Sequence, residues 1–224
     1  MLRNFIVVIL AGLILIPTAA WSQQGCDNGT VLANDDGTWE TAYNWEGCNA
    51  DHFIWYECYE SLYICSMRLV LTQVGLWSGS HSIDVYVWEN DGGQPGEVLC
   101  IYPDALVTEG IAFWPSVSQH DVPVHCCLED VEEHFLGFLV RWDDEPEWYI
   151  GGDLDGPGGC PGTLVNDGCG TPTGMQPLEN VMDPQGDPMF PGAKALGIRE
   201  VALFDDCDPV PVSPQSWGSI KALY

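Results

Sequence analysis

The chain contains 224 residues, with 33 Asp or Glu against 6 Lys or Arg, and its formal net charge is −27 at pH 7. A field of this sign repels phosphate backbones and anionic lipids, which argues against nucleic-acid binding and against association with an anionic membrane surface. Divalent cations and uncharged polysaccharides remain compatible partners, and repulsion between copies predicts a monomer.

The first residues predict a secretory signal peptide. Arg3 precedes an apolar run over 5–16, and Ala20 and Ser22 form the small-x-small pattern found before a cleavage point. The apolar run is short for a membrane anchor. We therefore expect residues 1–22 to be removed and the mature chain to be secreted or associated with the cell envelope.

Alternating apolar side chains predict β-strands in the order 67–74, 83–88, 134–142, 147–152 and 195–204. In the second of these, for example, Ile83, Val85 and Val87 share one face. Short strands separated by glycine, proline and acidic turns predict an all-β fold, namely an antiparallel β-sandwich of jelly-roll type.

The end of the chain has a different composition. Pro209, Pro211 and Pro214 predict an extended linker, and the last residues form an apolar tail. We expect one β-sandwich domain over 23–207, followed over 208–224 by a proline-rich linker and a tail that serves as a sorting or attachment tag.

All ten cysteines follow the predicted signal peptide, and an even number in an exported chain indicates up to five disulfides that staple the domain. A zinc site is the alternative, but no C-x-x-C pair occurs and the spacings are irregular. Cys160 and Cys169 close a short glycine-rich loop and are the predicted local pair. Adjacent Cys126 and Cys127 are expected to bond to different partners.

A short motif occurs twice. Residues 92–99 and 158–165 share G-G-x-P-G followed by an apolar pair, which suggests one hairpin turn used two times. The arrangement of strand, acidic turn, G-x-P-G and strand over 85–99 resembles hairpins in jelly-roll-like modules of secreted or surface-attached bacterial proteins. That similarity extends to 35–45 and 153–162, and it implies a sandwich in an extracellular or cell-envelope setting.

Calcium is the predicted cofactor. Asp153 and Asp155 lie two residues apart beside a glycine turn, and alternating carboxylates can wrap a hard cation. Glu89, Asn90 and Asp91 are a weaker candidate of the same kind. The alternative is that these side chains only form turns by bonding to their own backbone.

Aromatic residues suggest carbohydrate binding. Tyr86 and Trp88 fall on the strand face that also carries Asp84, and an exposed pair of rings there would form a platform on which sugars stack. The alternative is burial, which is the usual fate of large aromatic side chains.

No catalytic motif is present in the sequence, and no catalytic residue is assigned. We therefore expect a secreted, non-catalytic binding or structural module, with a polysaccharide or a cell-surface protein as its partner. A glycan-active hydrolase on the same scaffold and a calcium-dependent subunit of a surface layer or fibre are the alternatives.

Overall fold

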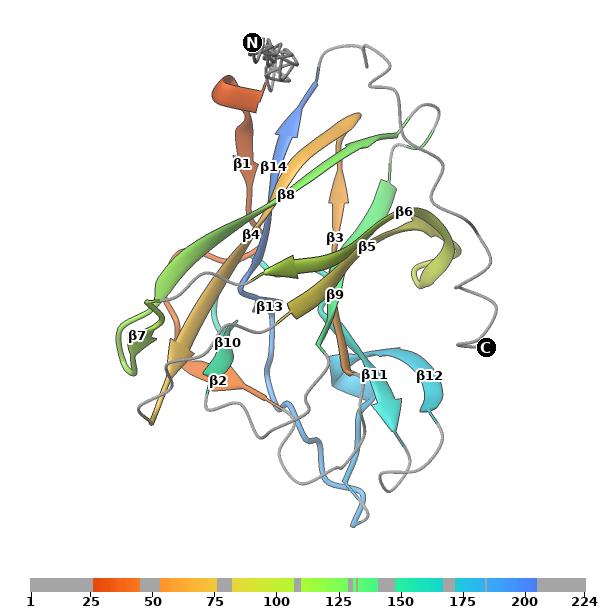
Figure 1. Cartoon of the computed structure of the whole chain (residues 1–224). Coiled ribbons are helices and arrows are strands. Elements are labelled where there is room, and N and C mark those ends of the chain that lie inside the picture. The colour runs from red at the N-terminus through yellow and green to blue at the C-terminus, as the bar shows by residue number, and fades with distance from the viewer. Residues whose placement is uncertain are drawn as a thin grey trace, which may run out of the picture.

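The computed structural model describes residues 26–44, 53–75, 82–106, 110–128, 131, 133–140, 148–166, 172–183 and 185–204. The predicted signal peptide and the tail from 208 onward lie outside the described residues. The described part forms an eight-stranded and a six-stranded β-sheet (Figure 1). None of its helices is long and apolar enough to cross a membrane.

The eight-stranded sheet contains β1 (Thr30–Leu32), β2 (Thr41–Tyr43), β4 (Tyr63–Gln73), β7 (Ala112–Phe113), β8 (Ser118–Cys127), β10 (Trp148–Asp153), β13 (Ala195–Leu196) and β14 (Ile198–Leu203). The six-stranded sheet contains β3 (Phe53–Glu60), β5 (Ser82–Asn90), β6 (Pro95–Leu106), β9 (Glu133–Val140), β11 (Gly162–Asn166) and β12 (Pro172–Pro177). Two short 3₁₀ helices, η1 (Cys26–Asn28) and η3 (Leu178–Asn180), complete the described elements.

The chain crosses repeatedly from one sheet to the other, as in a jelly roll. It passes from β3 to β4, returns to β5 and β6, crosses to β7 and β8, and returns to β9. All strand pairs are antiparallel except that of β4 with the short β7. The predicted antiparallel β-sandwich of jelly-roll type is confirmed.

The main core lies between the two sheets. The predicted apolar face of β5 is there, with Ile83, Val85 and Val87 fully buried, and Met67 and Leu69 of β4 oppose them from the other sheet. Burial of these side chains is the main favourable contribution to the stability of the sandwich.

The opposite face of the six-stranded sheet is also apolar, which the alternation along β5 did not predict. Trp88 is only 1% exposed and packs with Tyr56 and Phe135 in a second cluster, while Tyr86 is half-buried. The rings of Tyr86 and Trp88 stack on each other at 5.3 Å. Trp88 is therefore buried, which is the alternative to an exposed platform, because neighbouring strands supply apolar partners on that face.

Disulfides link distant parts of the sandwich: Cys26–Cys65, Cys58–Cys160 and Cys100–Cys126. Cys126 is thus not bonded to its neighbour in the sequence, as predicted.

The predicted Cys160–Cys169 pair is wrong, and Cys169 lies outside the described residues. The register explains the observed pair. Gly162 of β11 lies opposite Tyr56 of β3, and in an antiparallel pair the residue two before Gly162, Cys160, lies opposite the residue two after Tyr56, Cys58.

The repeated G-G-x-P-G motif has two different structures. In the first copy, Asp91 and Gln94 exchange backbone hydrogen bonds in the hairpin between β5 and β6, and Gly93 N–H donates to the Asn90 side chain. Asn90 and Asp91 therefore form this turn through the Asn90 side chain and the Asp91 backbone. The second copy connects β10 to β11, which belong to different sheets, so the prediction of one hairpin used twice is wrong.

Candidate functional site

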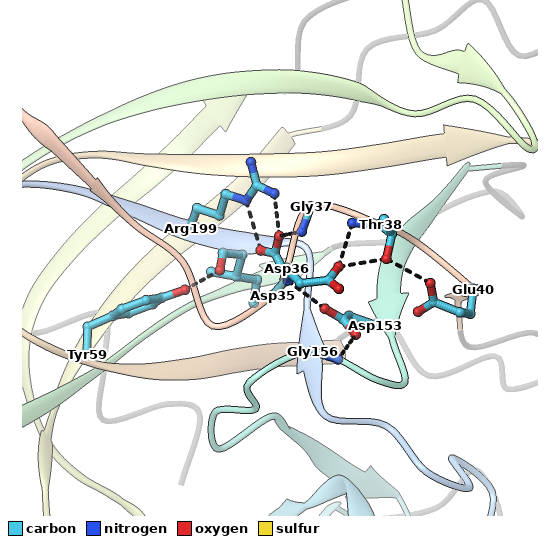
Figure 2. Close-up of polar contacts among 10 residues, drawn as sticks. Asp35, Asp36, Gly37, Thr38, Glu40, Tyr59, Asp153, Gly156 and Arg199 are labelled. Carbon is cyan, nitrogen blue, oxygen red and sulfur yellow. Dashed lines mark hydrogen bonds and ion pairs between the residues drawn. The ribbon is translucent and has the colours of Figure 1, made fainter.

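Two loops that are far apart in the sequence meet at one place on the sandwich. One loop precedes β2 and the other follows β10, and Thr41 of β2 lies opposite Gly152 of β10 in an antiparallel pair. The residues before 41 therefore lie beside those after 152. The Asp36 N–H donates to the Asp153 carboxylate at 2.8 Å, and the Gly158 N–H donates to the Asn34 carbonyl at 3.2 Å (Figure 2 shows the former).

The first feature of this junction is an acidic cluster of Asp36, Asp153 and Asp155. One carboxylate oxygen from each lies within 4.8 Å of the others. Asp153 is fully buried at the end of β10 and accepts hydrogen bonds from the N–H groups of Asp155, at 2.9 Å, and Gly156, at 2.7 Å. The two residues predicted from the sequence are brought together, and Asp36 joins them.

Negative charge accumulates around the cluster. Glu40, whose carboxylate accepts a hydrogen bond from Leu154 N–H at 2.9 Å, is the main cause that raises the pKa of Asp155. The hydroxyl and N–H of Thr38 bond to Asp36 and lower its pKa.

The guanidinium of Arg199 is engaged elsewhere. Arg199 forms a two-point ion pair with Asp35 and lies over the ring of Trp39, 5.6 Å from its centroid (Figure 2 shows the ion pair). The repulsion among Asp36, Asp153 and Asp155 is therefore left uncompensated by this side chain, and a divalent cation would relieve it.

The second feature is a polar cleft of about 690 Å³ at the same junction. Its polar lining comes from separate segments: Asn34, Glu60, Asn90, Glu133, Gly158 and Gly159. Val31, Leu32 and Cys58 contribute apolar surface. Glu60 and Glu133 are register partners on β3 and β9, so their side chains leave the same face of the sheet, and the Asn90 amide donates to Glu133 at 2.8 Å.

Glu57 connects three segments next to this cleft. Its fully buried carboxylate accepts hydrogen bonds from Leu196 N–H at 2.6 Å, from the Asn34 amide at 3.1 Å and from Cys160 N–H at 3.2 Å. A side chain at Gly159 would collide with it, since an added Cβ would lie 2.5 Å from its oxygen. Burial raises the pKa of Glu57 to about 8.

We expect the stability of the protein to fall as the pH rises from about 4.5 to about 8 because of Glu57. A carboxyl whose pKa is raised by folding binds more protons in the folded state than in the unfolded state, so its contribution is complete below the unfolded pKa and is lost above the folded one. Urea unfolding at several pH values measures this dependence. Glu57→Gln does not titrate and should flatten it; an unchanged slope in this variant would contradict the assignment.

Among the described residues, β7 and the residue after it expose aromatic rings that were not predicted from the sequence. Phe113 of β7 and the adjacent Trp114 are 50% and 38% exposed, and they lie beside Val74 at the end of β4, which is 62% exposed. The Trp114 N–H bonds to the Gln73 carbonyl at 3.0 Å and fixes this arrangement. Sequence reasoning missed these residues because their short strand shows no clear alternation.

Glu57 and Asp36 were also missed. Glu57 is embedded in an aromatic run that predicts only a strand, and nothing local distinguishes it as an anchor. Asp36 had a usable signal, because the Asp-Asp-Gly-Thr turn at 35–38 repeats the acid-and-glycine composition of 153–156.

The sequence and the structure were compared with known proteins. No family of known proteins matches the chain, no curated protein matches it, and no solved structure matches its fold.

Proposed function

We propose that this protein is an extracellular, non-catalytic binding module. It binds a neutral polysaccharide in the cleft lined by the loop before β2 and the loop after β10. The observation that carries the proposal is the composition of this cleft, in which Glu60, Asn90 and Glu133 converge beside an apolar wall. Disulfides in the described part of the chain support an oxidising, extracellular setting.

The chemistry of the cleft favours a ligand with many hydroxyl groups and no negative charge. Carboxylates accept hydrogen bonds from hydroxyls, and hydrogen bonds to charged groups are the stronger ones. The net charge of −27 opposes any polyanionic ligand. An uncharged glycan satisfies the carboxylates of Glu60 and Glu133 without electrostatic penalty.

Binding to soluble neutral oligosaccharides, measured by isothermal titration calorimetry, tests the proposal. We expect Glu133→Gln to weaken binding about tenfold, because the charge-assisted hydrogen bond is lost while the size of the side chain is kept. Glu97→Gln, the same change at an exposed position on β6, is the matched control and should leave binding unchanged. No binding across a panel of neutral glycans would contradict the proposal.

We further propose calcium as the ion of the acidic cluster. Asp36, Asp153 and Asp155 offer oxygen ligands, which calcium prefers, and the two loops that carry them also form the wall of the cleft. A bound ion would offset the repulsion between the loops and so hold that wall in place.

Calcium at about one hundred times its dissociation constant is expected to raise the melting temperature by about 5–10 °C, and EDTA should reverse the rise. Asp155→Asn should remove most of the effect. Asp91→Asn, which alters an acidic residue of the β5–β6 hairpin that is not a member of the cluster, is the control. Identical melting curves in calcium and in EDTA would show that no ion is held.

Hydrolysis of a glycan is the second candidate, and the presence of Glu60 and Glu133, which are register partners, in the lining of one cleft favours it. Glycosidases use two carboxyl groups about 5–10 Å apart. A reducing-end assay separates the two functions, since a binding module leaves its ligand intact. Release of sugar that is abolished by Glu60→Gln or Glu133→Gln would favour the hydrolase.

A further inference from the structure

The disulfide between Cys26 and Cys65 lies on a small cavity of about 250 Å³. It joins η1 to β4, and Cys26 is half-buried whereas Cys65 is only 2% exposed. Polar and ionisable side chains share the cavity: Ser66, Arg68, Asp121 and His125. The disulfide therefore lies beside groups that can influence the chemistry of its sulfur atoms.

A β-bulge in β8 places His125 next to this disulfide. The register of β8 against β4 shifts between Ile64 and Ser66, so that Val124 and His125 face a single residue of β4. His125 has a φ of 55°, a left-handed conformation that is uncommon for residues other than glycine. Such a conformation persists only where the surroundings impose it, and it is found disproportionately at functional sites.

The side chain of His125 contacts the sulfur directly. Its Nδ1 lies 3.8 Å from Cys26 Sγ and 3.4 Å from the Tyr63 hydroxyl. The Tyr102 hydroxyl donates to the His125 carbonyl at 2.7 Å and holds the backbone of the bulge. An imidazole in its protonated form at this position would stabilise a thiolate on Cys26.

We propose that Cys26–Cys65 is an exchangeable disulfide that is reduced by external dithiols, with His125 as the residue that stabilises the Cys26 thiolate. The first thiolate of the dithiol attacks Cys26 Sγ, the bond to Cys65 breaks, and Cys65 leaves with the electron pair and takes a proton from solvent. The second thiolate of the dithiol then attacks the other sulfur of the dithiol, which is bonded to Cys26 in the mixed disulfide. This attack displaces Cys26 as a thiolate beside His125. Two electrons pass from the dithiol, which becomes a cyclic disulfide, to the protein.

Exchange at this position would release the N-terminal strand. Cys26 anchors the segment that continues into β1, and β1 pairs with β14 through only three residues (Figure 1 shows the two side by side). Val31 and Leu32 of β1 line the polar cleft. Any effect of reduction on ligand binding rests on the proposed function, whereas the exchange reaction does not.

The test is a titration of the oxidised full chain with dithiothreitol, followed by acid quenching, alkylation and peptide mass spectrometry. We expect Cys26 and Cys65 to be alkylated at about tenfold lower dithiothreitol than Cys58 and Cys160, because the thiolate released at Cys26 is stabilised. Simultaneous reduction of all the mapped disulfides would overturn the proposal.

Two variants separate the role of His125 from a structural one. His125→Asn keeps a residue that tolerates the left-handed conformation and removes the imidazole, and it should abolish the preferential reduction. It should also raise the pH at which reduced Cys26 reacts with iodoacetamide. His120→Asn, on the same strand but bonded to Ser118, should change neither measurement. Unaltered reduction and alkylation in His125→Asn would overturn the assignment.

Discussion

Replacement of His134 by alanine is expected to lower the free energy of unfolding by about 3–5 kcal/mol. His134 of β9 and Glu200 of β14 join the two sheets through a contact of 2.6 Å between Nε2 and Oε2, and both side chains are fully buried. Within the described part of the chain, the second oxygen of Glu200 has no hydrogen-bond partner. The variant therefore leaves the buried carboxyl of Glu200 without a side-chain hydrogen-bond partner, which is costly in a medium of low dielectric constant.

Urea unfolding measures this loss, and two controls define its origin. Arg68→Ala breaks the exposed ion pair with Asp121 and should cost less than about 1 kcal/mol. The double variant His134→Leu with Glu200→Met replaces the pair by apolar side chains and should recover most of the loss. If the double variant is as unstable as His134→Ala, the loss comes from packing and the electrostatic explanation is wrong.

Removal of the Cys58–Cys160 disulfide by paired alanine substitutions is expected to cost about 3–5 kcal/mol. The two residues are 102 positions apart, and the bond restricts the unfolded chain accordingly. It also attaches the connection between β10 and β11 to β3, next to the Asn34 and Cys160 contacts of Glu57.

Chemical unfolding followed by tryptophan fluorescence provides the measurement for this second variant. Paired alanines at Cys26 and Cys65, which are 39 positions apart, are the matched control. Loop-closure entropy predicts a loss about 1 kcal/mol smaller for the control pair. Equal losses would indicate that strain or residual structure, and not the size of the closed loop, determines the contribution.

The fold class could be predicted because its signals are local. Alternation over 67–74 and 83–88 has the period of a β-strand, and Met67 and Val85 duly face the core. The turn after Asn90 likewise follows from its own residues. Period and turn chemistry depend on neighbours in the sequence, so they can be read without knowing which strands pair.

The candidate site could be predicted only in part for the same reason. Asp153 and Asp155 are near neighbours in the sequence and were recognised together. Asp36 is 117 residues from Asp153 in the sequence, and it joins them through the pairing of β2 with β10. The cleft likewise depends on that junction, and Glu57 acquires its role there from contacts with three distant segments.

The amino-acid order by itself determined strands such as those at 67–74 and 83–88, the hairpin turn at 91–94 and the acidic, cysteine-rich character of the chain. Only the tertiary structure decided that Cys160 bonds to Cys58 and that Trp88 is buried. The physical reason is that exposure and disulfide partners depend on which strands lie side by side. That choice is made by the packing of the two sheets as a whole, so no short segment contains it.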